Sequence, residues 1–439
     1  MNFHWKNSSI FSHGIFSLCL LLLLQVPLKL KAQLGLLQVT HPELITGQSL
    51  QPAMQNQLVS GSWAVGFSGY YDQASRPFAL GELPLSDNIL DAGEKDQILA
   101  SMGENNRFNQ HSGLGMVVAT KRGKHAFSFH YQSRQGAYLG FQNPASLGLI
   151  LKGNAAYAGQ TVTETEMELQ TANWQNFGLS HGMALSSGFQ FGYTLKFIQG
   201  QNLSRLGPSN FSLTTSDLGE EIQFRGDYDA FTARTSVGSS WGLGVDVGLA
   251  FEAGQQWRVE VAMQNLGFIT WQGNRNAHQF DLTYEGVWLS NLGQINNGGA
   301  EALFPTDSLR ALIIPDTQQT SLELPIDPRL RMAFRYSLGE RQEIHAVIHY
   351  GFTRSGPGGN GPMAGLVYTA EVSPVLKLGA LLSLGGVENW GFGLSAVGNV
   401  TVGEQIIRPY LQADNLVGFI VPTLGQASRV NAGLTWQLK

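Results

Sequence analysis

The sequence has little cysteine, little charge and no long apolar run. Its single cysteine is Cys19, so the chain offers no disulfide and no thiol chemistry beyond that position. Charged residues make up 13% of the 439 residues, against about 25% in ordinary globular proteins. No apolar run reaches the roughly 20 residues that a membrane-spanning helix needs. The net charge of −5 comes without a basic stripe, which argues against nucleic acid as a partner.

The N-terminus has the layout of a secretory signal peptide. Lys6 precedes an apolar run at 15–24, and Ala32 provides a small residue at the junction. A single membrane anchor is the alternative, but a run of about ten residues is too short to span a bilayer. We therefore expect a signal peptide at 1–32 with cleavage after Ala32, and export from the cytoplasm.

Glycine is abundant, with 53 residues, and it takes part in a strict alternation. In WGLGVDVGLAF, Trp241–Phe251, every odd position is large and apolar, while the even positions are Gly, Ala and Asp246. Such alternation predicts a β-strand with one apolar face. About fifteen segments of this kind recur, each about ten residues long, without helical blocks between most of them. Examples begin at Trp63, Leu114, Phe127, Phe189, Leu330, Ile344, Leu376 and Val430.

Short turns alternate with longer polar stretches along the chain. Turns of two or three residues are predicted near 121–124, 185–189, 252–258, 338–343 and 371–377, and loops near 71–110, 135–173, 200–235, 354–362 and 415–428. This is the topology of an outer-membrane barrel. An even strand number, needed if both ends are periplasmic, predicts one further strand in 290–328, at Leu309–Ile314 or Thr320–Leu324.

Turn lengths also predict which residues face each other. An Arg122-Gly123 loop would put Val118 opposite Phe127, and three-residue loops would put Glu252 opposite Arg258 and Glu371 opposite Lys377. One convincing helical stretch, DNILDAGEKDQILASM at 87–102, falls in the first long loop, where Asp91 can cap the helix.

The apolar faces point to lipid rather than to a protein core. Fifteen strands with four to six large apolar residues each cannot fill one soluble β-sandwich, whereas a closed barrel exposes them to the bilayer and leaves no unpaired edge. We predict an all-β fold: a transmembrane antiparallel up-and-down β-barrel of about 14–16 strands, with a short helix in the first long loop.

NLGFITWQGN at 265–274, GLGVDVGLAF before it and RPYLQADNLVG at 408–418 resemble an uncharacterised family of outer-membrane β-barrels from the Bacteroidota. QPAM at 51–54 is similar to that family's Asn-Pro-Ala motif, with Gln51 in place of Asn. The resemblance covers essentially the whole mature chain. It implies a barrel of the broad type of long-chain fatty-acid transporters and type IX secretion barrel components, and it implies no activity.

Motifs for catalysis or cofactor binding are weak. GLSHG at 178–182 matches a serine hydrolase pattern, but it lies within a strand rather than at a strand-to-helix elbow. His345 and His349 would lie roughly 13 Å apart along one strand, too far to share a metal. No helix follows GPGGNG at 356–361 to complete a phosphate site. We expect no enzyme, no cofactor and no metal.

Charged and polar residues on the inner face are the candidate functional residues. They would either fill and stiffen the lumen as a network, or line a polar constriction that sets selectivity. The candidates are Asp246, Glu252, Arg258, Glu260, Arg329, Arg331, Arg335, Glu343, His345, His349, Glu371 and Lys377.

Two functions fit these patterns. The first is a channel or transporter for small solutes, including hydrophobic ones, in which residues 33–57 form a periplasmic segment or a hatch and residues 58–439 form the barrel. The second is a structural or partner-binding barrel of a secretion or envelope assembly, similar to type IX secretion, without transport. The expected partners are outer-membrane lipids, the barrel assembly machinery and, for the second function, a periplasmic or secretion-system protein.

Overall fold

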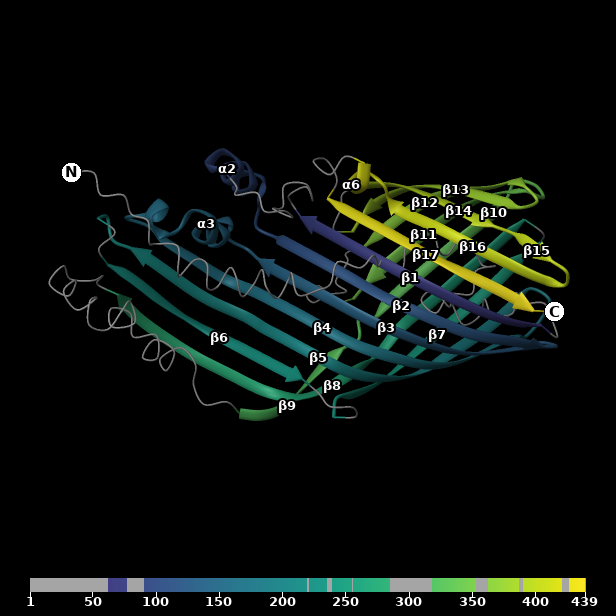
Figure 1. Ribbon diagram of the computed structural model, residues 1–439, viewed down its shortest axis with the longest axis horizontal. Helices are drawn as coiled ribbons and strands as arrows, with labels where there is room; N and C mark the ends of the chain where they lie inside the picture. The colour runs from purple at the N-terminus through teal and green to yellow at the C-terminus, as the bar shows by residue number, and fades with distance from the viewer. Residues whose placement is uncertain are drawn as a thin grey trace.

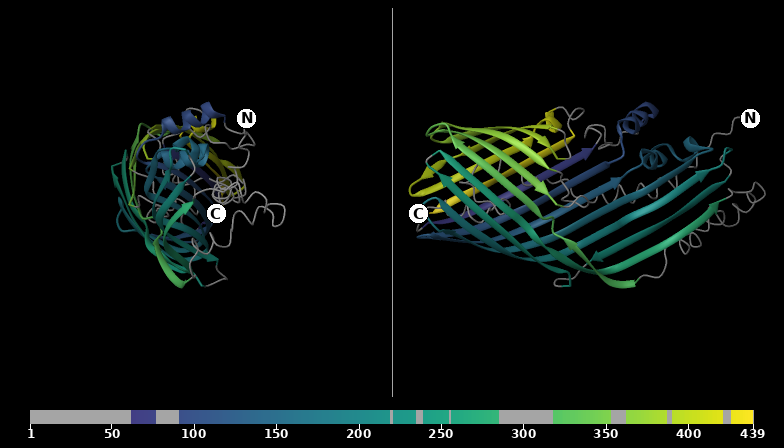
Figure 2. Two further views of the ribbon diagram at one scale, coloured as in Figure 1. Left: turned by 90° about the vertical axis from the view of Figure 1, so that its left-hand side faces the viewer. Right: turned by 180° about the vertical axis from the view of Figure 1, so that it is seen from behind.

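The computed structural model describes residues 62–76, 91–218, 221–234, 239–254, 256–284, 318–352, 362–386, 390–420 and 426–438. Within these ranges the strands form one antiparallel sheet (Figures 1 and 2). The strands are β1 (Trp63–Arg76), β2 (Asn106–Arg122), β3 (His125–Phe141), β4 (Thr161–Ala184), β5 (Phe189–Thr215), β6 (Ile222–Arg234), β7 (Trp241–Ala253), β8 (Trp257–Tyr284), β9 (Gln318–Pro325), β10 (Arg329–Ser337), β11 (Gln342–Gly351), β12 (Met363–Ser373), β13 (Leu376–Gly385), β14 (Trp390–Gly398), β15 (Val400–Val402), β16 (Gln405–Asn415) and β17 (Ala427–Leu438).

The sheet closes on itself. β1 pairs with β2 on one side and with β17 on the other, in a register that runs from Trp63↔Leu438 to Ala74↔Ala427. Closure gives every strand two neighbours at membrane height, so the bilayer meets no unpaired edge there. The predicted antiparallel barrel is therefore confirmed.

Three interruptions explain the strand number. The end of the barrel with the short turns is called the lower end here. β6 pairs with the upper parts of β5 and β8, and β7 pairs with their lower parts. In the same way, β9 and β10 both pair with β8, and β14 and β15 both pair with β16. The seventeen described strands thus make fourteen crossings, an even number within the predicted range. A strand is present at Thr320–Leu324, inside β9. It does not add the further crossing that was predicted, because β9 and β10 pair with successive parts of β8 and form one crossing. The alternative at Leu309–Ile314 falls outside the described residues.

The short turns lie at one end of the barrel. The predicted pairs Glu252↔Arg258 and Glu371↔Lys377 are confirmed. The first turn differs from the expectation, because Arg122 pairs with His125 and the loop is Gly123-Lys124. Gly123 has φ +57°, a left-handed conformation that favours glycine in such a turn. Because the loop starts one residue later than predicted, each residue of β2 pairs with a residue of β3 two positions further along. The same residues still face outward and inward as predicted.

The outer face is apolar and the inner face is small or polar. Along β7, Trp241 and Leu243 are 43% and 50% exposed, whereas Gly242 and Asp246 are buried. The same arrangement holds around the ring, where exposed Leu, Phe, Trp and Tyr side chains point outward from nearly every strand. An apolar exterior around a polar interior is the inverse of a soluble protein and fits a lipid environment.

One side of the barrel is much taller than the other (Figure 1). β5 and β8 have 27 and 28 residues, whereas β10 to β14 have 9 to 11. About 9–11 residues suffice for one crossing, so the upper parts of β4, β5, β6, β8 and β9 form a wall beyond the bilayer. The prediction of loops at 135–173 and 200–235 is therefore wrong for most of both ranges, which are strand.

Helices lie at the end opposite the short turns. The predicted helix in the first long loop is confirmed as α2 (Ala92–Ser101). Asp91 and Glu94 form a capping box at its N-terminus. Residues 87–90 of that prediction lie outside the described residues. A second helix, α3 (Pro144–Lys152), was not predicted, and Lys152 forms an ion pair with Asp96 of α2. Among the described residues, no helix has both the length and the apolar character needed to cross a bilayer.

Candidate functional site

Asp246 and Lys196 form a buried ion pair on the inner face of the barrel. Lys196 Nζ lies 2.7 Å from Asp246 Oδ1, and each side chain is only 5% exposed. The two strands, β5 and β7, pair directly although β6 separates them in the chain. Removing two charges from water is costly unless further hydrogen bonds satisfy them, and the neighbouring residue Asn265 supplies these bonds.

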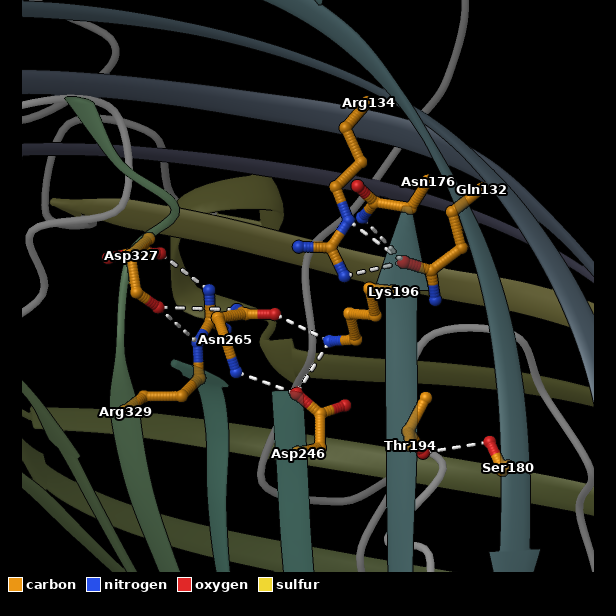
Figure 3. A network of polar contacts seen from close by, with 10 residues as sticks. All are labelled: Gln132, Arg134, Asn176, Ser180, Thr194, Lys196, Asp246, Asn265, Asp327 and Arg329. Atoms are coloured by element: carbon orange, nitrogen blue, oxygen red, sulfur yellow. Dashed lines mark hydrogen bonds and ion pairs between the residues drawn. The ribbon is translucent and has the colours of Figure 1, made fainter. Parts of the chain in front are cut away.

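Asn265 connects the ion pair to the break between β9 and β10 (Figure 3). Its backbone N donates to Asp246 Oδ1 at 2.7 Å, its Oδ1 accepts from Lys196 Nζ at 2.7 Å, and its Nδ2 donates to the Asp327 carbonyl at 3.2 Å. Asn265 has φ +59°, and the β7–β8 register shifts between Val245 and Val247. The bulge therefore presents the Asn265 backbone and side chain to the lumen together.

The same bulge exchanges the two faces of β8. Below it the even residues, such as Glu260 and Gln264, are buried, and above it the odd residues Ile269 and Trp271 are buried. A one-residue insertion shifts the alternation of a strand by one position. Apolar side chains of NLGFITWQGN thus turn from the lipid into the barrel at this point.

The network continues on both sides of this centre. Asp327, which has φ +65°, lies in the break between β9 and β10 and pairs with Arg329 at 2.5 Å. On the other side, Gln132 accepts from Arg134 Nε at 3.0 Å and from Asn176 at 3.4 Å. Figure 3 shows these groups converging from β3, β4, β5, β7, β8, β10 and the β9–β10 break.

Other predicted residues gather nearer the short turns. Arg258 forms ion pairs with Glu252 and, at 2.7 Å, with Glu260. Glu343 forms a second centre, with Arg335 Nη1, His345 Nε2 and Lys377 Nζ each 3.4 Å from its carboxylate. Glu371 stays exposed opposite Lys377.

Arg331 and His349 are buried on neighbouring strands. His349 lies within electrostatic range of Arg329, Arg331 and Arg429. Arg429 in turn pairs with Asp72 at 3.0 Å, and both side chains are almost fully buried. Four further residues of the site could not be predicted from the sequence, because their partners lie on strands that are distant in the chain or at irregular positions. They are Asp72, Arg429, Lys196 and Asp327.

Side chains reach across the lumen at this level. Tyr70 on β1 and His111 on β2 lie within electrostatic range of Asp327 and Arg329. β1 and β10 are seven crossings apart in either direction around the ring of fourteen. From another pair of separated strands, Arg429 Nη1 approaches Met363 Sδ at 3.6 Å. The lumen is therefore crossed by a layer of paired charges and amides rather than left as a wide polar pore.

An apolar cluster lies on the inner face above this layer. It follows Lys196 and Asn265 along β5 and β8 toward the tall wall, and Trp174, Leu322 and Leu324 pack against it. Apolar residues inside the barrel were not predicted from the sequence. They arise because the bulge changes which alternate residues of β8 point inward, and only recognition of the bulge would have predicted them. The buried members are Ala172, Ile198, Leu203, Phe231, Ala233, Ile269, Trp271 and Ile326.

The described residues do not assemble a metal or hydrolase site. No group of three or more His, Cys, Asp or Glu among them is placed to hold a metal ion. Ser180 of GLSHG lies within β4, where its Oγ is 2.7 Å from Thr194 Oγ1. A strand position of this kind lacks the elbow that exposes a nucleophilic serine.

The closed ring, the apolar exterior and the polar interior define a transmembrane β-barrel. The chain belongs to a family of unknown function (DUF5723), whose profile matches residues 57–403. No curated protein matches the sequence.

Solved structures similar to this chain include bacterial transporters. The Ralstonia pickettii toluene transporter TbuX is 11% identical, over 88% of this chain and 92% of that chain, with a TM-score of 0.47. A Pseudomonas aeruginosa FadL homologue is 10% identical, over 88% and 91% of the two chains, with a TM-score of 0.46. The translocator domain of the Neisseria meningitidis autotransporter NalP is 8% identical, over 87% and 89%, with a TM-score of 0.33.

Proposed function

We propose that the protein is an outer-membrane channel that admits small apolar solutes and excludes ions and sugars. The observation that carries the proposal is the apolar cluster around Trp271 and Phe231, which lies inside the barrel directly above the charged layer. A water-filled porin would have a polar lumen throughout. The buried members of the cluster pack against one another, so an apolar molecule that enters from the side of the tall wall would contact the half-buried Trp174, Leu322 and Leu324 at its edge.

The charged layer supports the exclusion of polar solutes. Its groups are mutually paired, as Asp246 is with Lys196 and Asp72 with Arg429. An ion or a sugar would have to break these contacts in a poorly hydrated space, at a cost that few new contacts could offset. An apolar solute can bind above the layer without disturbing it.

The filled lumen also supports a second function. A barrel whose interior is crossed by paired side chains can serve as a rigid platform for a secretion or envelope partner, without transport. A stable periplasmic or surface partner recovered with the protein from native membranes would favour this function, whereas a solitary monomer there would count against it.

Binding of an apolar probe to the purified barrel tests the proposal. We expect naphthalene to bind, and Trp174→Ala to weaken its affinity by about tenfold, because stacking on an aromatic ring contributes about 0.5–1.5 kcal/mol. The matched control is Trp390→Ala, which removes an exposed tryptophan from the lipid-facing side and should leave the affinity unchanged. Absence of binding, or equal losses in the two variants, would reject the apolar site.

A further inference from the structure

The strands β2, β3 and β5, together with the part of β4 from Leu169 onward, contain Lys and Arg but no Asp or Glu. Residues 107–141 and 169–215 contain no Asp or Glu, and they contain seven Lys or Arg. Three of these cations, Lys121, Arg122 and Lys124, are gathered at the β2–β3 turn. The charge is therefore concentrated at the short-turn end of these strands, where no carboxylate of the same strands offsets it.

Two histidines lie beside this turn on the lipid-facing surface. His125 and His181 stack with ring centroids 5.3 Å apart, and Nδ1 of His125 is 3.1 Å from Nε2 of His181. His181 also stacks on Phe127 at 4.8 Å, and Phe127 is 49% exposed on the outer face. Imidazoles that face outward among lipid-exposed aromatic rings need a polar partner in the membrane.

The strand register places this pair at the boundary of the apolar belt. Trp63 pairs with Thr120, Thr120 with Phe127, and Phe127 with His181, so one row crosses four strands. Trp63 is half exposed to lipid, and barrels place such tryptophans at the membrane–water interface. The β2–β3 turn beyond this row therefore lies in the headgroup layer of the leaflet at the short-turn end.

We propose that Arg122, His125 and His181 bind the phosphate of an anionic phospholipid in that leaflet. The guanidinium of Arg122 is exposed next to His125 and can hold a phosphate with two parallel hydrogen bonds. The contact between the histidines uses one nitrogen of each ring and leaves His125 Nε2 and His181 Nδ1. In the neutral pair one of these two nitrogens carries a hydrogen and can donate to the phosphate, and protonation of the second ring makes both of them donors. Lys124 in the turn adds positive charge, and Phe127 supplies an apolar surface for the acyl chains.

Lipid binding by the purified full-length protein tests this site. We would add phosphatidylglycerol or phosphatidylcholine to the barrel in neutral detergent and count retained lipids by native mass spectrometry. We expect a preference for phosphatidylglycerol that Arg122→Gln lowers about fivefold, as one basic residue near an anionic surface contributes. The double variant Arg122→Gln with His181→Gln should have a still lower preference for phosphatidylglycerol.

Arg341→Gln is the matched control, because Arg341 is an exposed arginine in another short turn, next to Glu340. It should leave the preference unchanged. Equal binding of the two lipids to the wild type, or equal effects of Arg122→Gln and Arg341→Gln, would overturn the proposal. So would displacement of the lipid by inorganic phosphate at an equal concentration, since this would indicate a site for the free ion.

Folding is checked separately by the shift in gel mobility that folded barrels show on heating. If a variant does not fold, the wild type still gives a decisive result. Salt screens charges that are exposed to solvent, so raising the ionic strength from about 0.05 to about 0.5 M should abolish most of the preference. A preference that salt does not change would overturn the proposal.

Discussion

Lys196 and Asp246 lie at the centre of the inner network, and their energetic role follows from their burial. Each has an opposite charge at 2.7 Å and shares a hydrogen bond with Asn265. Loss of one partner leaves an uncompensated buried charge, whereas loss of both leaves only a change in packing. The single substitution should therefore destabilise the protein much more than the double substitution does.

We expect Asp246→Asn to lower the free energy of unfolding by about 3–5 kcal/mol, because Lys196 stays buried without its counter-charge. The double variant Lys196→Met with Asp246→Leu should recover most of this loss. Asp281→Asn, at the exposed pair with Arg225, is the control and should cost less than about 1 kcal/mol. Urea unfolding of the micelle-bound barrel measures all three, and a double variant that is as unstable as Asp246→Asn, or less stable, would contradict the account.

Asn265 should tolerate glycine better than alanine. Both substitutions remove its side-chain bonds to Lys196 and Asp327, but only alanine is strained at φ +59°. We expect Asn265→Ala to be less stable than Asn265→Gly by about 1–2 kcal/mol. Thermal unfolding compares them, and equal stabilities would mean that the bulge relaxes to ordinary strand geometry.

At the scale of elements, the alternation of apolar and small residues predicts strands only where lipid lies on one side. Leu195 on β5 follows this rule and is exposed. The upper half of the same strand, beyond Gln199, stands outside the bilayer, so its outer face is not forced to be apolar. For this reason the sequence analysis interpreted 200–235 as a loop, although long-range pairing with β4, β6 and β8 makes it strand.

The lipid-facing and water-facing parts of this wall should differ in their tolerance of charge. We expect Leu195→Arg to destabilise the barrel by about 2–4 kcal/mol, the cost of a cation on the lipid face near the midplane. Leu218→Arg makes the same change in the β5–β6 connection, where Leu218 is 82% exposed, and should stay within about 0.5 kcal/mol. Unfolding in lipid bilayers measures both, and similar losses would place the upper wall inside the membrane.

Much of the inner site was predictable by face but not by partner. The even positions of β7 and the odd positions of β10 and β11 indicated Asp246, Arg329, Arg331, His345 and His349 as inward residues. Their partners were hidden, because a barrel closes through pairs such as β1–β17 and β5–β7 that no hairpin in the sequence specifies. The apolar cluster was hidden as well, since a single bulged residue reverses the inward parity of β8.

At the scale of the whole molecule, the net charge of −5 conceals an uneven distribution. The carboxylates are absent from most of β2 to β5, whereas charged residues of the other strands pair either inside the lumen, as Asp72 and Arg429 do, or in exposed positions, as Arg225 and Asp281 do. The ring thus combines a lipid-facing exterior, a layer of paired charges that crosses the lumen, and the apolar cluster above this layer. Together these features support selective passage or binding of apolar solutes over an open aqueous pore.

The relative uptake of an apolar and a polar solute of similar size tests this central claim most directly. The protein would be expressed in cells that lack their own general porins, and uptake of naphthalene and of a pentose would be measured against cells without it. We predict faster uptake of naphthalene with no change for the pentose, and loss of the gain in Trp174→Ala but not in Trp390→Ala. Faster entry of the pentose, or no change for either solute, would contradict the account.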